Sequence, residues 1–158
     1  MAVFKIFIIL LLRQSLCGFL EIKWTAWCGR FPATHEVIYS PFQPDRTNPV
    51  TGVVEAHRGT DIAAPTGTEV VAADAGEVVD ASYSSSAGYH IIIDHGNGIK
   101  TYYYHSSQLI AEVGDIVEAG DVIMLVGSTG QSTGPHLHFG ITVDGEWVDA
   151  MDYTYIGE

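Results

Sequence analysis

The chain has 158 residues, 47% of them hydrophobic and 16% charged, so it is long enough for one domain with a hydrophobic core and short for more than one. Its formal net charge of −12 argues against the basic surfaces on which nucleic-acid binding depends. The same charge disfavours simple electrostatic adhesion to anionic lipids or wall polymers. We therefore expect no nucleic-acid partner.

The N-terminal segment has the pattern of a targeting sequence. Lys5 precedes the apolar residues 6–12, and Arg13 follows them. This run is too short to cross a bilayer, which takes about 20 apolar residues, but it suits the hydrophobic region of a secretory signal. Arg13 interrupts the approach to a cleavage site after Cys17, so an uncleaved anchor is the alternative. We expect residues 1–17 to be a signal peptide or a short membrane anchor, and the protein to be extracellular or tethered at the cell envelope.

The two cysteines lie in the N-terminal part of the chain. Cys17 and Cys28 have neither Cys-x-x-Cys spacing nor a histidine at zinc-finger spacing, so a structural zinc site is not predicted. A disulfide between them is permitted outside the cell but is not implied. We interpret residues 18–36 as a linker.

The rest of the chain has the pattern of a turn-rich β protein. From Ile38 onward short apolar runs alternate with Gly, Pro, Asp and Asn, without a competing run of helical periodicity. Pro44 and Pro49 predict an irregular loop, and Asn97-Gly98 predicts the turn of a hairpin. The predicted strands lie within residues 69–73, 76–81, 89–94, 99–105, 114–117, 120–127 and 136–143. The sequence predicts an all-β domain over residues 37–158.

Histidines at separate places in the chain carry the functional signal. In His136-Leu137-His138 the two histidines are two residues apart, so on a strand both project from one face. His57 and Asp61 form a second group, and His105 stands between the two groups. Imidazoles and one carboxylate as ligands, with further histidines nearby, are the groups typical of a catalytic zinc site.

These residues resemble one known family, the lysostaphin/LytM-type zinc endopeptidases of peptidoglycan. The resemblance covers residues from about 37 to 153. It implies an antiparallel β-sheet or sandwich with a groove, the LytM-like catalytic domain (a duplicated hybrid motif). The motifs that carry it occur in the family's order and spacing: Ser40-Pro41-Phe42, Pro49-Val50-Thr51-Gly52, His57 to Pro65, Asp94 to Gly98, Tyr104-His105, and Gly127 to Phe139.

The resemblance also implies the roles of individual residues. By the family's motifs, His57, Asp61 and His138 would bind Zn²⁺, leaving a fourth position for water, whose pKa a bound zinc lowers towards about 7. His105 and His136 would be the catalytic histidines that exchange protons. Either could be the general base; we favour His136, because it stands two residues from His138.

For Tyr103 and the remaining histidines, the prediction rests on their position in the sequence. Tyr103 stands two residues before His105, so on a regular strand it would share that face and could contact the substrate carbonyl, although a tyrosine filling the wall explains the position equally well. His95 lies in the turn motif and is expected to be structural. His35 and His90 belong to no motif, and we expect them to be surface or packing residues.

The function that the resemblance implies is hydrolysis of peptide bonds in the stems or cross-bridges of bacterial peptidoglycan. The alternative is a non-catalytic LytM-type regulator that activates other wall hydrolases, as some relatives lacking zinc ligands do. The complete ligand set favours the enzyme. The chain departs from the family pattern at Gln43 and in the position of Arg46, while Arg58 and Thr60 fill variable positions. These differences concern a groove wall and bear on substrate preference more than on activity.

Overall fold

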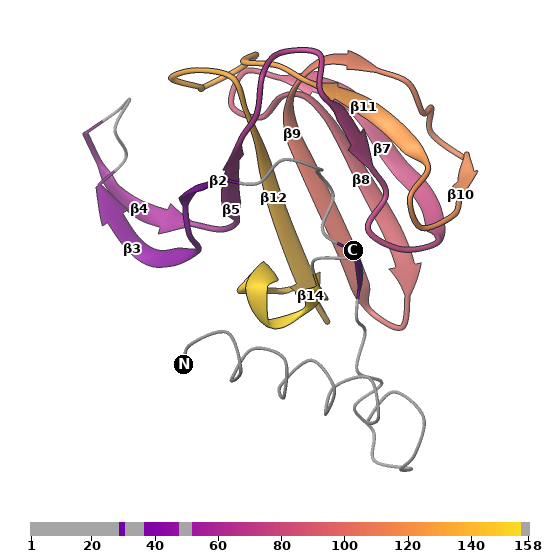
Figure 1. The fold of residues 1–158 in the computed structure, drawn as a ribbon. Helices are drawn as coiled ribbons and strands as arrows, with labels where there is room; N and C mark the ends of the chain where they lie inside the picture. The colour runs from indigo at the N-terminus through magenta and orange to yellow at the C-terminus, as the bar shows by residue number, and fades with distance from the viewer. Residues whose placement is uncertain (1–28, 31–36, 48–51, 156–158) are drawn as a thin grey trace, which may run out of the picture.

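The computed structural model describes residues 29–30, 37–47 and 52–155, which are almost entirely β-strands (Figure 1). The predicted targeting segment, residues 1–17, lies outside the described residues, and so does most of the predicted linker. The elements are β1 (Gly29–Arg30), β2 (Val37–Ser40), β3 (Gln43–Thr47), β4 (Val54–His57), β5 (Thr60–Ala63), β6 (Glu69–Val71), β7 (Gly76–Ser84), β8 (Gly88–Gly96), β9 (Ile99–Leu109), β10 (Ile116–Val117), β11 (Val122–Val126), β12 (His136–Val143), β13 (Glu146–Val148), the 3₁₀ helix η1 (Ala150–Asp152) and β14 (Thr154–Tyr155).

One large antiparallel sheet organises the molecule. Its main path runs β10-β7-β8-β9-β12-β5-β2, while β11 joins β6 to β9 and β13 pairs with β12. Figure 1 shows the long strands β12, β9, β8 and β7 side by side. β3 and β4 form a separate two-stranded pair beside β5, and β1 pairs with β14 in parallel. The predicted all-β, antiparallel class is confirmed.

The hydrophobic core lies on one face of the long strands. Strand alternation puts Leu137, Phe139 and Ile141 of β12 on this face, and all three are fully buried. Met124 of β11 belongs to the same buried cluster. Because the core occupies this face, the alternate residues of β12 are free to line the opposite one.

The hairpin predicted at Asn97-Gly98 is confirmed. β8 ends at Gly96 and β9 begins at Ile99, so the loop has two residues. Both have positive φ, 51° and 79°, the conformation that a type I′ turn requires.

The irregular loop predicted from Pro44 and Pro49 is wrong at Pro44, because this segment forms the β3–β4 pair, while Pro49 lies outside the described residues. A proline cannot donate to a strand ladder and is tolerated on edge strands. β3 pairs only with β4, and the register shifts between Gln43 and Arg46, on either side of Pro44.

Within the part of the chain that the structure describes, no helix is long and apolar enough to cross a membrane.

Candidate metal centre and groove

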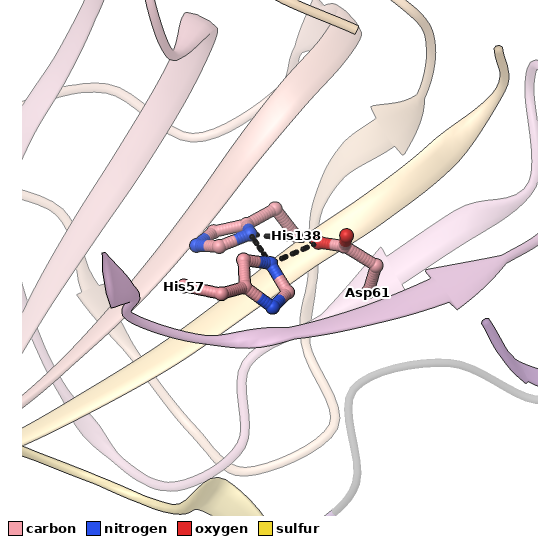
Figure 2. Close-up of side chains that lie close together, drawn as sticks. All are labelled: His57, Asp61 and His138. Carbon is pink, nitrogen blue, oxygen red and sulfur yellow. Dashed lines mark hydrogen bonds and ion pairs between the residues drawn. The ribbon is translucent and has the colours of Figure 1, made fainter. Parts of the chain in front are cut away.

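Three residues that are far apart in the sequence converge beside the β4–β5 bend (Figure 2). β4 ends at His57, β5 supplies Asp61, and β12 supplies His138, which is paired with Asp61 across the strands. His57, Asp61 and His138 are 4%, 5% and 9% exposed, so three polar side chains are buried together. Such burial is costly unless the groups bind one another or a shared ion.

The three side chains direct one ligand atom each at a common point. His57 Nε2 lies 3.0 Å from Asp61 Oδ1, His138 Nδ1 lies 2.8 Å from the same oxygen, and the two ring nitrogens are 3.2 Å apart. Ligands of a tetrahedral zinc with bonds of about 2.0 Å would stand about 3.3 Å from one another. Two imidazole nitrogens and one carboxylate oxygen at these separations fit a zinc ion with one position left open.

The surrounding residues determine the protonation of these three donors. His57 Nδ1 lies 2.8 Å from the carbonyl oxygen of Pro41, which can only accept, so Nδ1 carries the proton and Nε2 presents its lone pair to the cluster. Burial alone would raise the pKa of Asp61, but the neighbouring rings of His138 and His57 outweigh this effect and hold that pKa well below the usual range. Burial lowers the pKa of His138. A carboxylate and neutral imidazoles are the forms that bind metal.

The expected catalytic histidines stand beside the cluster. The rings of His105 and His136 are 4.7 Å apart, and His136 Nε2 is 3.8 Å from Asp61 Oδ1. His105 Nδ1 is 2.8 Å from the carbonyl oxygen of Thr129, and His136 Nδ1 is 2.8 Å from that of Gly134. Each ring therefore keeps Nε2 available as a proton acceptor. Burial lowers the pKa of His105 to about 4, so it is neutral at pH 7.

The structure places Tyr103 away from the groove. Its side chain is fully buried in the core, where its hydroxyl accepts from the backbone N–H of Ala73 at 2.9 Å. The sequence argument assumed regular alternation up to His105, but His105 has φ of 66°. The pairing also shifts there, because Tyr89 faces Ser106 and Ile91 faces Tyr103. This bulge turns His105 to the other face.

Tyr104 takes the place expected for Tyr103. It lies opposite His138 across the β9–β12 ladder, and the two rings are stacked, with centroids 5.2 Å apart and planes at 10°. His90, expected at the surface or in packing, lines the same groove and is 8% exposed. Its Nε2 lies 3.4 Å from Asp80 Oδ2. His90 belongs to no motif, and Tyr104, although it stands in the Tyr104-His105 motif, could have been placed against His138 only from cross-strand register.

His95 lies outside the groove, as expected for a structural residue. Its Nδ1 is 2.8 Å from the carbonyl oxygen of Ala75, and its Nε2 is 2.7 Å from Thr101 Oγ1. The Thr101 hydroxyl is also bonded to that of Tyr103, at 3.0 Å.

The cluster lies in a groove of about 540 Å³ that is open to solvent. Besides the histidines, its lining includes two arginines, Arg46 and Arg58, and several small polar side chains. This volume lies within the range of ligand-binding clefts, about 300–1,000 Å³. The full lining is Arg46, Ala56, His57, Arg58, Asp61, Ser84, Ser86, Ala87, His90, Tyr104, His105, Gln131, Ser132, Thr133, His136 and His138.

Comparison with known proteins identifies peptidases as the relatives of this chain. Residues 55–150 match the model of Peptidase family M23. The chain is 40% identical over 125 residues to the peptidoglycan DD-endopeptidase ShyB of Vibrio cholerae, a match that covers 78% of this chain and 29% of ShyB. The chain thus spans less than a third of the length of this curated relative.

Two solved structures extend the comparison. A zinc-containing peptidase from Vibrio cholerae is 39% identical and superposes with a TM-score of 0.74, covering 79% of this chain and 39% of that one. The catalytic domain of the antimicrobial peptidase lysostaphin from Staphylococcus simulans is 33% identical, with a TM-score of 0.62, covering 75% of this chain and 90% of that domain.

Proposed function

The chain belongs to peptidase family M23, and on that premise we propose that it is a zinc-dependent endopeptidase that hydrolyses peptide bonds in the stems or cross-bridges of bacterial peptidoglycan. The observation that carries the proposal is the convergence of His57 Nε2, Asp61 Oδ1 and His138 Nδ1 in an open groove, with two further histidines beside them. The relationship to a peptidoglycan DD-endopeptidase supports the substrate class.

His57, Asp61 and His138 would hold the zinc ion. Zinc bound there would act as a Lewis acid on the scissile carbonyl and make water a better nucleophile at neutral pH. The carboxylate and the two neutral imidazoles give the site the charge and ligand types of catalytic zinc centres.

The remaining histidines would move the protons. His136 Nε2, on the side of Asp61, would accept the proton of the attacking water. His105, less than 5 Å away between ring centroids, would receive a proton on its unprotonated Nε2 from His136, donate a hydrogen bond to the tetrahedral oxyanion and pass the proton to the leaving amine. The carbonyl oxygens of Thr129 and Gly134 hold the two rings in the orientation that this exchange needs.

The non-catalytic regulator is the second candidate from the sequence. Such a protein needs a groove that binds a partner but not a set of donors that fits a metal. Here the donors converge and the neighbouring histidines present unprotonated nitrogens to the groove. These observations favour the enzyme.

We propose that the chain has three segments with separate roles. Residues 37–158 would form the catalytic domain, within which the family match lies. Residues 1–17 would direct export or anchor the protein, and residues 18–36 would link the two. Fractionation of producing cells, with the mature N-terminus determined by sequencing, tests this arrangement. A protein confined to the cytosol with Met1 retained would contradict it.

Release of new amino groups from purified peptidoglycan tests the activity. We expect release with the zinc-loaded protein, loss of release with a chelator, and recovery when zinc is returned. Mass spectrometry of the fragments would identify the bond. Zinc-loaded protein that releases no amines from peptidoglycans of differing cross-link chemistry would contradict the enzyme and favour the regulator.

A further inference from the structure

The groove differs in charge from the chain as a whole. The chain has a formal net charge of −12, yet the groove lining contains two arginines and, among the described residues, a single carboxylate. That carboxylate, Asp61, is engaged by His57 and His138. An acidic protein that gathers cations around its groove is suited to an anionic ligand there.

Arg58 is the groove cation for which the described part of the chain supplies no side-chain partner. It follows the metal-site residue His57 directly, and its side chain is exposed at the groove wall. Within residues 37–47 and 52–155, it makes no hydrogen bond or ion pair with another side chain. A guanidinium has five donors in a planar arrangement that matches a carboxylate, so Arg58 is available to bind one from solution.

The position of Arg58 is close to the reacting centre. Arg58 follows the donor His57 directly, and it lines the same groove as the ring of Tyr104. That ring is stacked on His138. A group bound to Arg58 would thus lie beside the three-donor cluster rather than at a distant part of the groove.

Arg46 has a different use. Its Nη1 donates to Ser40 Oγ at 2.7 Å and lies 3.8 Å from Asp61 Oδ2, the carboxylate oxygen that faces away from the two histidine nitrogens. It therefore helps to hold Asp61 in place and adds positive charge to the groove lining. Arg46 is committed to positioning, whereas Arg58 is free for the ligand.

We propose that Arg58 binds a free α-carboxylate on the substrate residue whose amine is released, so that the groove selects cross-links carrying a carboxylate next to the scissile nitrogen. The inference rests on the proposed function. In a bond between two D-centres, the carbon attached to the scissile nitrogen also carries a free carboxylate. A glycine inside a bridge carries none. Hydrolysis breaks the C–N bond, adds hydroxyl to the acyl carbon and a proton to the amine, and leaves this carboxylate unchanged.

Two synthetic peptides that differ only in this group test the proposal. Both contain a D-Ala–D-residue bond; one has a free carboxylate on the leaving residue and the other a primary amide. With the zinc-loaded full chain, kcat/KM should favour the carboxylate peptide by about tenfold or more, the range expected for a charge-assisted pair. Arg58→Gln should remove this preference by lowering kcat/KM on the carboxylate peptide alone, and Arg58→Lys should restore part of it.

Lys100→Gln is the matched control, because it removes the same charge from a lysine that pairs with Asp94 at 3.2 Å and does not line the groove. Its preference should equal that of the wild type. Zinc content and the thermal unfolding midpoint show that each variant is folded. Equal rates on both peptides with the wild type, or an equal loss on both with Arg58→Gln, would overturn the carboxylate site alone. Failure of the zinc-loaded wild type on both peptides and on peptidoglycan would overturn the proposed function as well.

Discussion

Single residues in the groove share a hydrogen-bonding arrangement that prepares them for their proposed roles. His57, His105 and His136 each have Nδ1 at 2.8 Å from a backbone carbonyl oxygen, and each therefore presents Nε2 without a proton. His138 is the exception, because it presents Nδ1 to Asp61. Backbone carbonyls from two loops, Pro41 between β2 and β3 and Thr129 and Gly134 between β11 and β12, thus select the tautomers of the site.

The proposed proton acceptor can be tested separately from the metal. His136→Ala should keep zinc bound, because His136 is not one of the three donors, and should lower kcat by roughly 100- to 10,000-fold, the usual contribution of a general base. Zinc analysis and kcat on peptidoglycan fragments measure both effects. Ser132→Ala is the control: its hydroxyl lies 3.3 Å from His136 Nδ1, but the Gly134 carbonyl still orients the ring. A His136→Ala variant with normal kcat would remove His136 from the mechanism.

At the scale of the elements, two local irregularities build the site on a regular sheet. The bulge in β9 turns His105 to the groove face, at the cost of a left-handed backbone that histidine adopts only occasionally. The bend between β4 and β5 brings His57 and Asp61 to one place. Gly59 stands at this bend, against the ring of His138. The regular strand β12 positions His136 and His138, whereas the bulge and the bend position His105, His57 and Asp61.

The close approach at Gly59 gives a prediction for the bend. A Cβ on Gly59 would lie 2.6 Å from His138 Nε2 and 2.7 Å from the Phe139 carbonyl oxygen. Gly59→Ala should therefore displace His138 and weaken zinc affinity at least about tenfold, since small misplacements of ligands are costly. Competition with a chelating dye measures this. Gly134→Ala, where a Cβ would meet nothing within 4 Å, should bind zinc as the wild type does. Equal affinities in both variants would contradict the packing argument.

The β8–β9 hairpin carries a separate pH dependence through His95. Burial lowers the pKa of His95, although the Ala75 carbonyl and the charges of Asp74 and Asp94 oppose this. A lowered folded-state pKa stabilises the fold above the unfolded value of about 6.5, and this contribution is lost as the pH falls below it. Urea unfolding between pH 5 and 7.5 should show a smaller loss of stability on acidification in His95→Gln than in the wild type. Identical pH dependence would exclude His95 as the source.

At the scale of the whole molecule, the sequence predicted what depends on local pattern. The strand predicted at 136–143 coincides with β12, and the Asn97-Gly98 turn lies where it was expected. The β3–β4 pair was not predicted, because each of these strands forms only by pairing with the other, and the prolines favoured a loop. Tyr103 was assigned to the wrong face, because one bulged residue reverses strand alternation and leaves no mark in the sequence.

The groove function of His90 needed the three-dimensional structure. It belongs to no motif, and only the pairing of β7 with β8 brings Asp80 near it. The charge contrast between the groove and the chain as a whole was equally hidden, because Arg46 and Arg58 are 12 positions apart, and Arg46 joins the groove only after β3 pairs with β4. Long-range placement, rather than residue type, decides which polar residues form the site.

The zinc content of the purified protein and of its His138→Ala variant tests the central claim most directly. The wild type should contain one zinc per chain, and His138→Ala should lose it, because the variant keeps only two of the three donors. His90→Gln, altered in the same groove but outside the donor set, should retain one zinc. A His138→Ala variant that still holds one zinc per chain would contradict the assignment of the metal centre.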